Sequence, residues 1–153
     1  EFRRVLFRSQ SGLVEKAGRL LGQTAGISVP AGYVGETVVG TGTAVSVSGS
    51  GFTTVASVTL TPGDWDISAF LYLGATSGVT DIDFAISDTP NSASGSSTLF
   101  NNGHNQRGNN SPGAVGIPSY QQLVTSTTTY YLCAGQGGAS QTVNGSITAR
   151  RRS

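Results

Sequence analysis

The stretch 60–74 carries the clearest pattern of hydrophobic and polar positions in the chain. It opens with a turn at Thr61–Asp64, in which proline fixes one dihedral angle and glycine adopts a conformation that other residues resist. Strict alternation follows, and a period of two predicts a strand with one face in a hydrophobic core. The core face carries Trp65, Ile67, Ala69, Leu71 and Leu73, and the outer face Asp66, Ser68, Phe70 and Tyr72.

Similar short segments recur along the chain, separated by turns rich in glycine, and no helical period is sustained among them. This spacing is typical of an all-β protein, and we expect an antiparallel β-sandwich, jelly-roll-like, of about eight strands. The predicted strands are Gly35–Val39, Ala44–Ser48, Thr53–Thr61, Asp64–Leu73, Val79–Asp88, Tyr120–Ser126, Thr128–Ala134 and Gln141–Arg150.

The strands 64–73 and 79–88 are expected to form a hairpin, closed by the four-residue loop 75–78. One register buries every apolar residue, whereas a slip of one residue would place two aspartates in the core at a large cost in free energy. That register sets Leu71 opposite Ile82, Ala69 opposite Phe84 and Ile67 opposite Ile86.

The same register predicts a candidate interface on the outer face of the hairpin. It places Phe70 opposite Asp83 and Tyr72 opposite Asp81. Aromatic side chains on an outer face need cover, and aromatics are enriched where subunits meet. We therefore expect these four residues to lie between subunits; cover by the second sheet or by the N-terminal arm is the alternative.

The domain organisation follows from the composition of the N-terminal part. Residues 1–9, EFRRVLFRS, match the direct translation of a common sequencing-library adaptor, so we interpret them as an artefact and expect the native protein to continue upstream. Residues 10–30 are predicted to be a linker or arm with a possible short helix at Leu13–Leu21, weakened by three glycines. Residues 31–153 form the predicted β-sandwich domain.

Composition narrows the possible partners. Between Gln10 and Ala149 there are three basic residues against seven acidic ones, a balance of −4 that disfavours a nucleic-acid partner. No apolar run approaches the ~20 residues that a membrane-spanning helix needs, so we expect no membrane insertion. With a single cysteine, Cys133, the chain has neither an intrachain disulfide nor a cysteine-based zinc site.

The segment 89–113 is the longest without a pattern, and it is rich in Asn, Ser and Gly. A loop of this length is usually functional or disordered. Amide groups and an aromatic ring suit a glycan ligand, so we treat four residues as a candidate surface-binding loop: Asn101, His104, Arg107 and Tyr120.

No catalytic constellation stands out. The pairs Asp64 with Asp66 and Asp81 with Asp83 could serve acid–base hydrolysis or bind calcium, but outward strand carboxylates are more often solvated. His104, the only histidine, has no nucleophile elbow to serve. We therefore expect no enzymatic activity, no metal and no cofactor. Arg150–Arg152 are expected to be solvated or paired with acidic residues of a neighbouring subunit.

Four segments resemble a widespread domain of tailed-phage and prophage proteins, described as tail-fibre or virion structural proteins. They are AGYVGE at Ala31–Glu36, LTPGDWDIS at Leu60–Ser68, TYYLCA at Thr129–Ala134 and ITARR at Ile147–Arg151. The resemblance implies an all-β, non-enzymatic virion component, assembled in the host cytoplasm and trimeric.

Two functions from different classes follow. The first is a virion structural and interaction protein, the C-terminal domain of a tail-fibre, spike or capsid-decoration protein, whose partners are its own copies in a homotrimer and other virion proteins. The second is a carbohydrate-binding module that recognises a cell-surface glycan.

Overall fold

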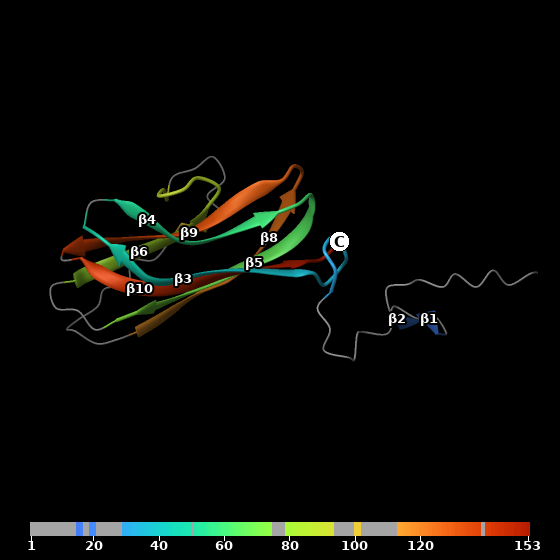
Figure 1. The fold of residues 1–153 in the computed structure, drawn as a ribbon, viewed down its shortest axis with the longest axis horizontal. Coiled ribbons are helices and arrows are strands. Elements are labelled where there is room, and N and C mark those ends of the chain that lie inside the picture. The colour runs from blue at the N-terminus through green and yellow to red at the C-terminus, as the bar shows by residue number, and fades with distance from the viewer. Residues whose placement is uncertain are drawn as a thin grey trace, which may run out of the picture.

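The computed structural model describes residues 15–16, 19–20, 29–49, 51–74, 79–93, 100–101, 113–138 and 140–153. Figure 1 shows strands and no helix in this part of the chain, and therefore no helical membrane span is found in it. The strands are β1 (Glu15–Lys16), β2 (Arg19–Leu20), β3 (Thr37–Val47), β4 (Phe52–Leu60), β5 (Gly63–Leu73), β6 (Val79–Ser87), β7 (Phe100–Asn101), β8 (Gly113–Val124), β9 (Thr128–Gly138) and β10 (Gln141–Arg151).

Strands β3 to β10 form two four-stranded antiparallel sheets, in the orders β3-β10-β5-β8 and β4-β9-β6-β7. Four antiparallel pairs are nested in sequence: β3 with β10, β4 with β9, β5 with β8, and β6 with β7. This nesting is the topology of a long hairpin rolled into a double sheet, which is a jelly roll. The predicted all-β, jelly-roll-like sandwich is confirmed.

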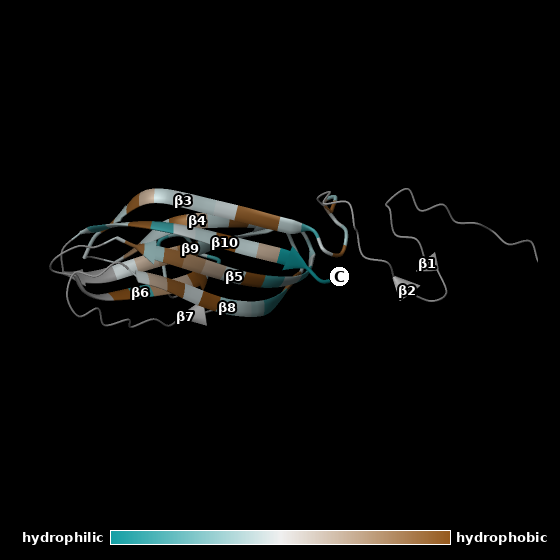
Figure 2. Ribbon diagram, turned by 90° about the horizontal axis from the view of Figure 1, so that it is seen from below, coloured by the Kyte–Doolittle hydropathy of each residue, from teal (hydrophilic) through white to brown (hydrophobic). Residues whose placement is uncertain are grey.

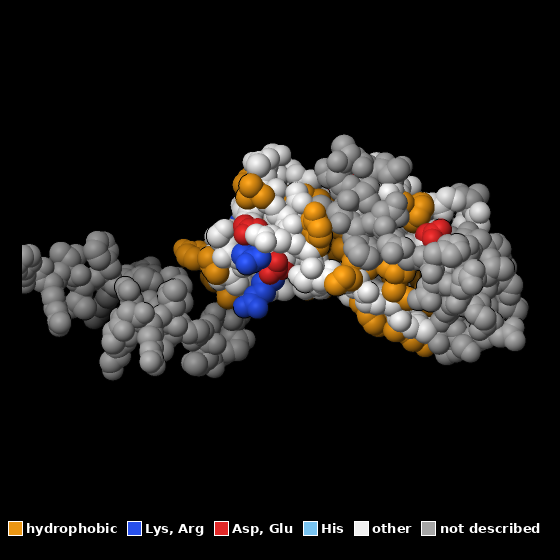
Figure 3. Space-filling view, turned by 180° about the vertical axis from the view of Figure 1, so that it is seen from behind, with side chains coloured by type: hydrophobic (Ala, Val, Ile, Leu, Met, Phe, Trp, Pro, Cys, Tyr) orange, Lys and Arg blue, Asp and Glu red, His pale blue; other side chains and the backbone are white. Residues whose placement is uncertain are grey.

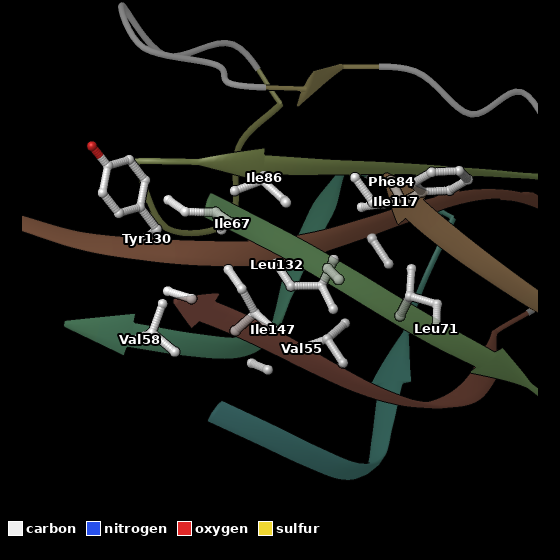
Figure 4. Close-up of a cluster of buried hydrophobic side chains, with 14 of the residues drawn as sticks. Val55, Val58, Ile67, Leu71, Phe84, Ile86, Ile117, Tyr130, Leu132 and Ile147 are labelled. Atoms are coloured by element: carbon white, nitrogen blue, oxygen red, sulfur yellow. The ribbon is translucent and has the colours of Figure 1, made fainter. Parts of the chain in front are cut away.

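The core lies between the two sheets, where apolar side chains from both meet (Figure 4). The alternation predicted for β5 is confirmed, because its core-facing residues are all buried and Trp65 is fully so. From the opposite sheet, Ile82, Phe84 and Ile86 of β6 are buried as predicted. Burial of apolar surface at roughly 25 cal/mol per Å² makes this layer the main source of stability.

The predicted hairpin of β5 and β6 is wrong. Strand β5 pairs with β10 and β8, whereas β6 pairs with β9 and β7 in the other sheet. The two strands therefore contribute to the same core from opposite sides. Alternation identifies which face of a strand is buried, but a buried face can be covered across the sandwich as well as beside it, so alternation does not choose the partner strand.

Several strand boundaries also differ from the prediction. Segments 35–39 and 44–48 are predicted as two strands, but they lie in one strand, β3, which continues past a bulge of one extra residue in β3, between Gly42 and Val45, opposite Val143 and Gly145 of β10. Strand β8 begins at Gly113, seven residues before the predicted start, and β7 was not predicted. Within the segment 13–21, for which a short helix is predicted, the described residues form β1 and β2, which pair antiparallel.

Glycines explain why the sequence pattern predicts two strands within β3. A Cβ atom at Gly40 would lie 1.9 Å from the backbone oxygen of Ser57, and one at Gly42 would lie 1.8 Å from that of Val55. Strand β3 thus approaches β4 of the other sheet more closely than any side chain would allow. These glycines permit close contact between the sheet edges and do not mark a turn.

Candidate functional site

The outer face of the sheet β3-β10-β5-β8 carries the exposed aromatic pair predicted from the sequence. Phe70 is 45% exposed and Tyr72 is 44% exposed. Residues paired across strands share a face of the sheet, so the register identifies their neighbours. Phe70 lies between Ser146 and Gly116, and Tyr72 lies between Asn144 and Ala114. Both rings therefore stand above smaller neighbours in the same rows.

The aspartates that were predicted to flank these rings lie elsewhere. Asp81 and Asp83 belong to β6 in the opposite sheet, so the structure does not bring the four residues of the candidate interface together. The reason is the misassigned hairpin, which supplied the wrong neighbours. The outward orientation of Phe70 and Tyr72 did not depend on that pairing, and it is found in the structure.

Charged groups occupy the other end of the same face, close to the C-terminal end of β10 (Figures 2 and 3). Asp64 accepts hydrogen bonds from the Gln121 amide nitrogen at 3.1 and 2.9 Å. Asp66 lies 3.5 Å from Arg152, and both side chains are more than one third exposed. Arg150 is exposed beside Asp66 in the register, and its side chain has no hydrogen bond or ion pair among the described residues.

Arg151 differs from its two neighbours because its side chain points inward and is 5% exposed. Its Nε donates a hydrogen bond of 2.9 Å to the Glu36 carboxylate, and one terminal nitrogen donates 2.7 Å to the Pro62 carbonyl. The other terminal nitrogen donates to the Thr61 hydroxyl. The guanidinium lies 4.3 Å from the centre of the Trp65 ring, a cation–π distance.

The expectation that all three arginines are solvated or paired with a neighbouring subunit is therefore wrong for Arg151. It pairs within its own chain, with a glutamate 115 positions away in the sequence. No local pattern could show this contact, because it depends on the fold bringing the ends of the domain together. Within the run, alternation along the strand turns Arg151 inward and its neighbours outward.

Glu36 completes the arrangement from the N-terminal side. Its carboxylate also accepts a 2.7 Å hydrogen bond from the Gly32 amide, and backbone hydrogen bonds join Gly35 and Glu36 to Arg151. Burial by itself would raise the pKa of the Glu36 carboxyl. The hydrogen bonds from Gly32 and Arg151 and the charge of Arg151 outweigh burial, and the pKa lies below its ordinary value.

Three of the four segments that carry the phage resemblance meet at Arg151. Ala31–Glu36 supplies Glu36, Leu60–Ser68 supplies the Thr61–Gly63 turn and Trp65, and Ile147–Arg151 supplies the arginine. At Gly63, with φ near 153°, a Cβ atom would lie 1.9 Å from the guanidinium. The structure thus explains why these residue types occur in the three segments: their contacts connect the N-terminal and C-terminal ends of the domain.

The candidate surface-binding loop is only partly within the described residues. Asn101 lies in β7 opposite Ala85, and Tyr120 in β8 is 43% exposed. His104 and Arg107 lie outside the described residues, as do 94–99 and 102–112 of the long segment. Cys133 is buried, with its sulfur 3.7 Å from the Thr54 hydroxyl.

The described residues offer little for catalysis or metal binding. They contain no group of three or more His, Cys, Asp or Glu side chains that could hold a metal ion. A hollow of about 240 Å³ lies at the arginine end, lined by Val34, Gly35, Asp66 and Arg150–Arg152. Of its charged lining residues, Asp66 pairs with Arg152, Arg151 pairs with Glu36 outside the lining, and Arg150 has no side-chain partner among the described residues.

Comparisons with known proteins identify the fold. The chain matches no protein-family model and no curated protein. It is similar in structure to VP2 of the infectious bursal disease virus subviral particle, with a TM-score of 0.54 and 10% identity over 94% of this chain and 38% of VP2. A chain of the T13 particle of that virus gives 0.53 and 9%, over 94% and 36%.

A chain of the cyanophage Pam1 capsid is 18% identical over 90% of this chain and 97% of its own length, with a TM-score of 0.46 that is too low to add weight. The present chain spans under two fifths of the VP2 chain. Identity near 10% shows a shared fold and nothing finer. The fold of the matched part of VP2 is thus the fold of this chain.

Proposed function

We propose that this chain is a structural protein of a virion, and that it acts by assembling with its own copies and with other virion proteins. The observation that carries the proposal is the aromatic pair on the outer face of the jelly roll. Two rings exposed by nearly half, above smaller neighbours, suit burial against another protein surface. The capsid-type fold supports the same setting.

The finer assignment rests on the resemblance. It makes the chain the C-terminal domain of a phage tail-fibre, spike or decoration protein, non-enzymatic, assembled in the host cytoplasm and built into a homotrimer. A glycan-binding module is the competing function. Of the four residues predicted for it, only Tyr120 has a described side chain, and it lies on the sheet rather than on the long loop.

Sedimentation velocity of the full chain over a range of concentrations tests the proposal. We expect self-association that is weakened in the double variant Phe70→Asp with Tyr72→Asp, since two desolvated carboxylates would oppose the contact through this face. Ser57→Asp is the matched control, because Ser57 is exposed on β4 of the opposite sheet. A chain that stays monomeric throughout, and that binds glycans on an array, would favour the carbohydrate-binding function instead.

A further inference from the structure

One cation on the outer face has no side-chain partner among the residues that the structure describes. Three described acidic groups near it are each engaged: Glu36 by Arg151, Asp64 by Gln121 and Asp66 by Arg152. Arg150 is left over, although it lies next to Asp66 in the register of β10 and β5. Asp66 itself is held only at 3.5 Å by an exposed arginine, so it can accept a second donor.

The register makes this face complementary to itself. Along β10 and β5, the rows are Arg150 with Asp66, Thr148 with Ser68, Ser146 with Phe70, and Asn144 with Tyr72. The first row thus joins opposite charges, and the third joins a small side chain with a large one. A two-fold axis parallel to these strands and midway between them exchanges β10 and β5. After this rotation, each residue of one copy faces, in the other copy, the residue that is its cross-strand neighbour in its own chain.

We propose that the outer face of β3-β10-β5-β8 binds the same face of a second copy about this two-fold axis. Arg150 of each copy then meets Asp66 of the other, so the ion pair is made twice. Phe70 of each copy lies over Ser146 of the other, where a small side chain leaves room for the ring. Strand directions stay aligned, which is the usual way in which two sheets pack face to face.

The area of the face agrees with a specific but weak contact. Four strands spaced by roughly 4.8 Å, and four rows of outward residues spaced by roughly 6.8 Å, cover on the order of 500 Å² per copy. Both copies together would bury on the order of 1,000 Å², at the low end for specific interfaces. A contact of this size suits an assembly that depends on many repeated weak contacts.

The inference rests on the proposed function and refines it. A contact between two copies of one surface is isologous and generates a two-fold axis, whereas a three-fold ring needs two different surfaces. The aromatic pair and the unpaired arginine share one face, and therefore this face suits a two-fold contact. A three-fold contact predicted from the resemblance would use another part of the surface.

Reciprocal charge reversal tests the pairing. In sedimentation velocity of the full chain, Arg150→Asp alone and Asp66→Arg alone should each weaken dimerisation at least about tenfold, because like charges would face each other across the axis. The combined variant should restore the wild-type dissociation constant to within a few-fold. Ser57→Asp is the control for added charge, and near-ultraviolet circular dichroism of Trp65 verifies that every variant is folded.

A second pair of variants covers the case in which charge reversal disturbs folding. Phe70→Ser should weaken the dimer, and Phe70→Ser with Ser146→Phe should restore it, because the exchange keeps one large and one small residue in each row. A trimer without a dimer, a dimer unaffected by Arg150→Asp, or a double reversal without recovery would overturn the two-fold contact. In each of these outcomes the chain still self-associates, and the proposed function is untouched.

Discussion

Each end of β10 buries a polar side chain, but only one of these two side chains has hydrogen-bond partners among the described residues. Arg151 at the last position donates to Glu36, Thr61 and Pro62 and lies on the Trp65 ring. Gln141 at the first position is 3% exposed, and neither its amide nitrogen nor its amide oxygen has a hydrogen-bond partner within the described structure. A buried polar group stabilises a fold only when its partners are present, so the arginine end is expected to be the stable one.

Arg151→Met should have the largest effect, because it leaves Glu36 buried without its counter-charge. Removing one partner of a buried ion pair costs about 3–5 kcal/mol. Urea unfolding measures the loss in the free energy of unfolding. Arg152→Met is the matched control one position along, and it should cost less than about 1 kcal/mol since its ion pair is exposed. Equal losses in the two variants would contradict the special status of Arg151.

Gln141→Leu should have the opposite sign. It replaces a buried amide that lacks partners by an apolar side chain of similar size, and an unsatisfied buried polar group costs about 1–3 kcal/mol. We expect the free energy of unfolding to rise by up to that amount. Thr142→Leu, at the exposed neighbouring position, should give no such gain. A destabilised Gln141→Leu protein would mean that the amide is hydrogen-bonded in solution.

The sequence predicted more of the fold than of the candidate site. Alternation identified the buried face of β5 and the outward rings of Phe70 and Tyr72, because those depend on one strand alone. It could not predict which strands pair. It therefore predicts the aspartates of β6 beside Phe70 and Tyr72, although β6 pairs with β9 in the opposite sheet. The contact between Glu36 and Arg151 spans 115 positions, and no local pattern encodes such a contact.

Lowering the pH should reduce the stabilisation that Glu36 provides at the Arg151 end of β10. The pKa of Glu36 is lower in the folded chain than its ordinary value of 4.5, so the unfolded chain binds the proton more readily. Its contribution to stability is therefore complete above about 4.5 and is lost as the pH falls through the lower folded pKa. In Glu36→Gln this contribution should be absent. Urea unfolding between neutral and acidic pH should show the two proteins converging as the pH falls.

The smallest predicted effect concerns the bulge where β3 pairs with β10. This bulge lies near the end of β10 that carries Gln141. Ala44 has a φ of 54°, in the left-handed region that costs a residue with a Cβ atom roughly 1–2 kcal/mol. Its amide donates a 2.7 Å hydrogen bond to the Asn144 side chain, which holds the bulge in this conformation. Ala44→Gly removes the steric cost but gives the unfolded chain more freedom, which offsets part of the gain.

The net expectation is a rise of up to about 1 kcal/mol in the free energy of unfolding. Ala114→Gly is the matched control, because Ala114 is an exposed strand residue that is not among those with a positive φ. That substitution should lower the stability by about 0.5–1 kcal/mol. If both glycine variants lost stability alike, the left-handed conformation at Ala44 would carry no cost. The unsatisfied amide of Gln141 would then be the one remaining reason to expect lower stability at this end of β10.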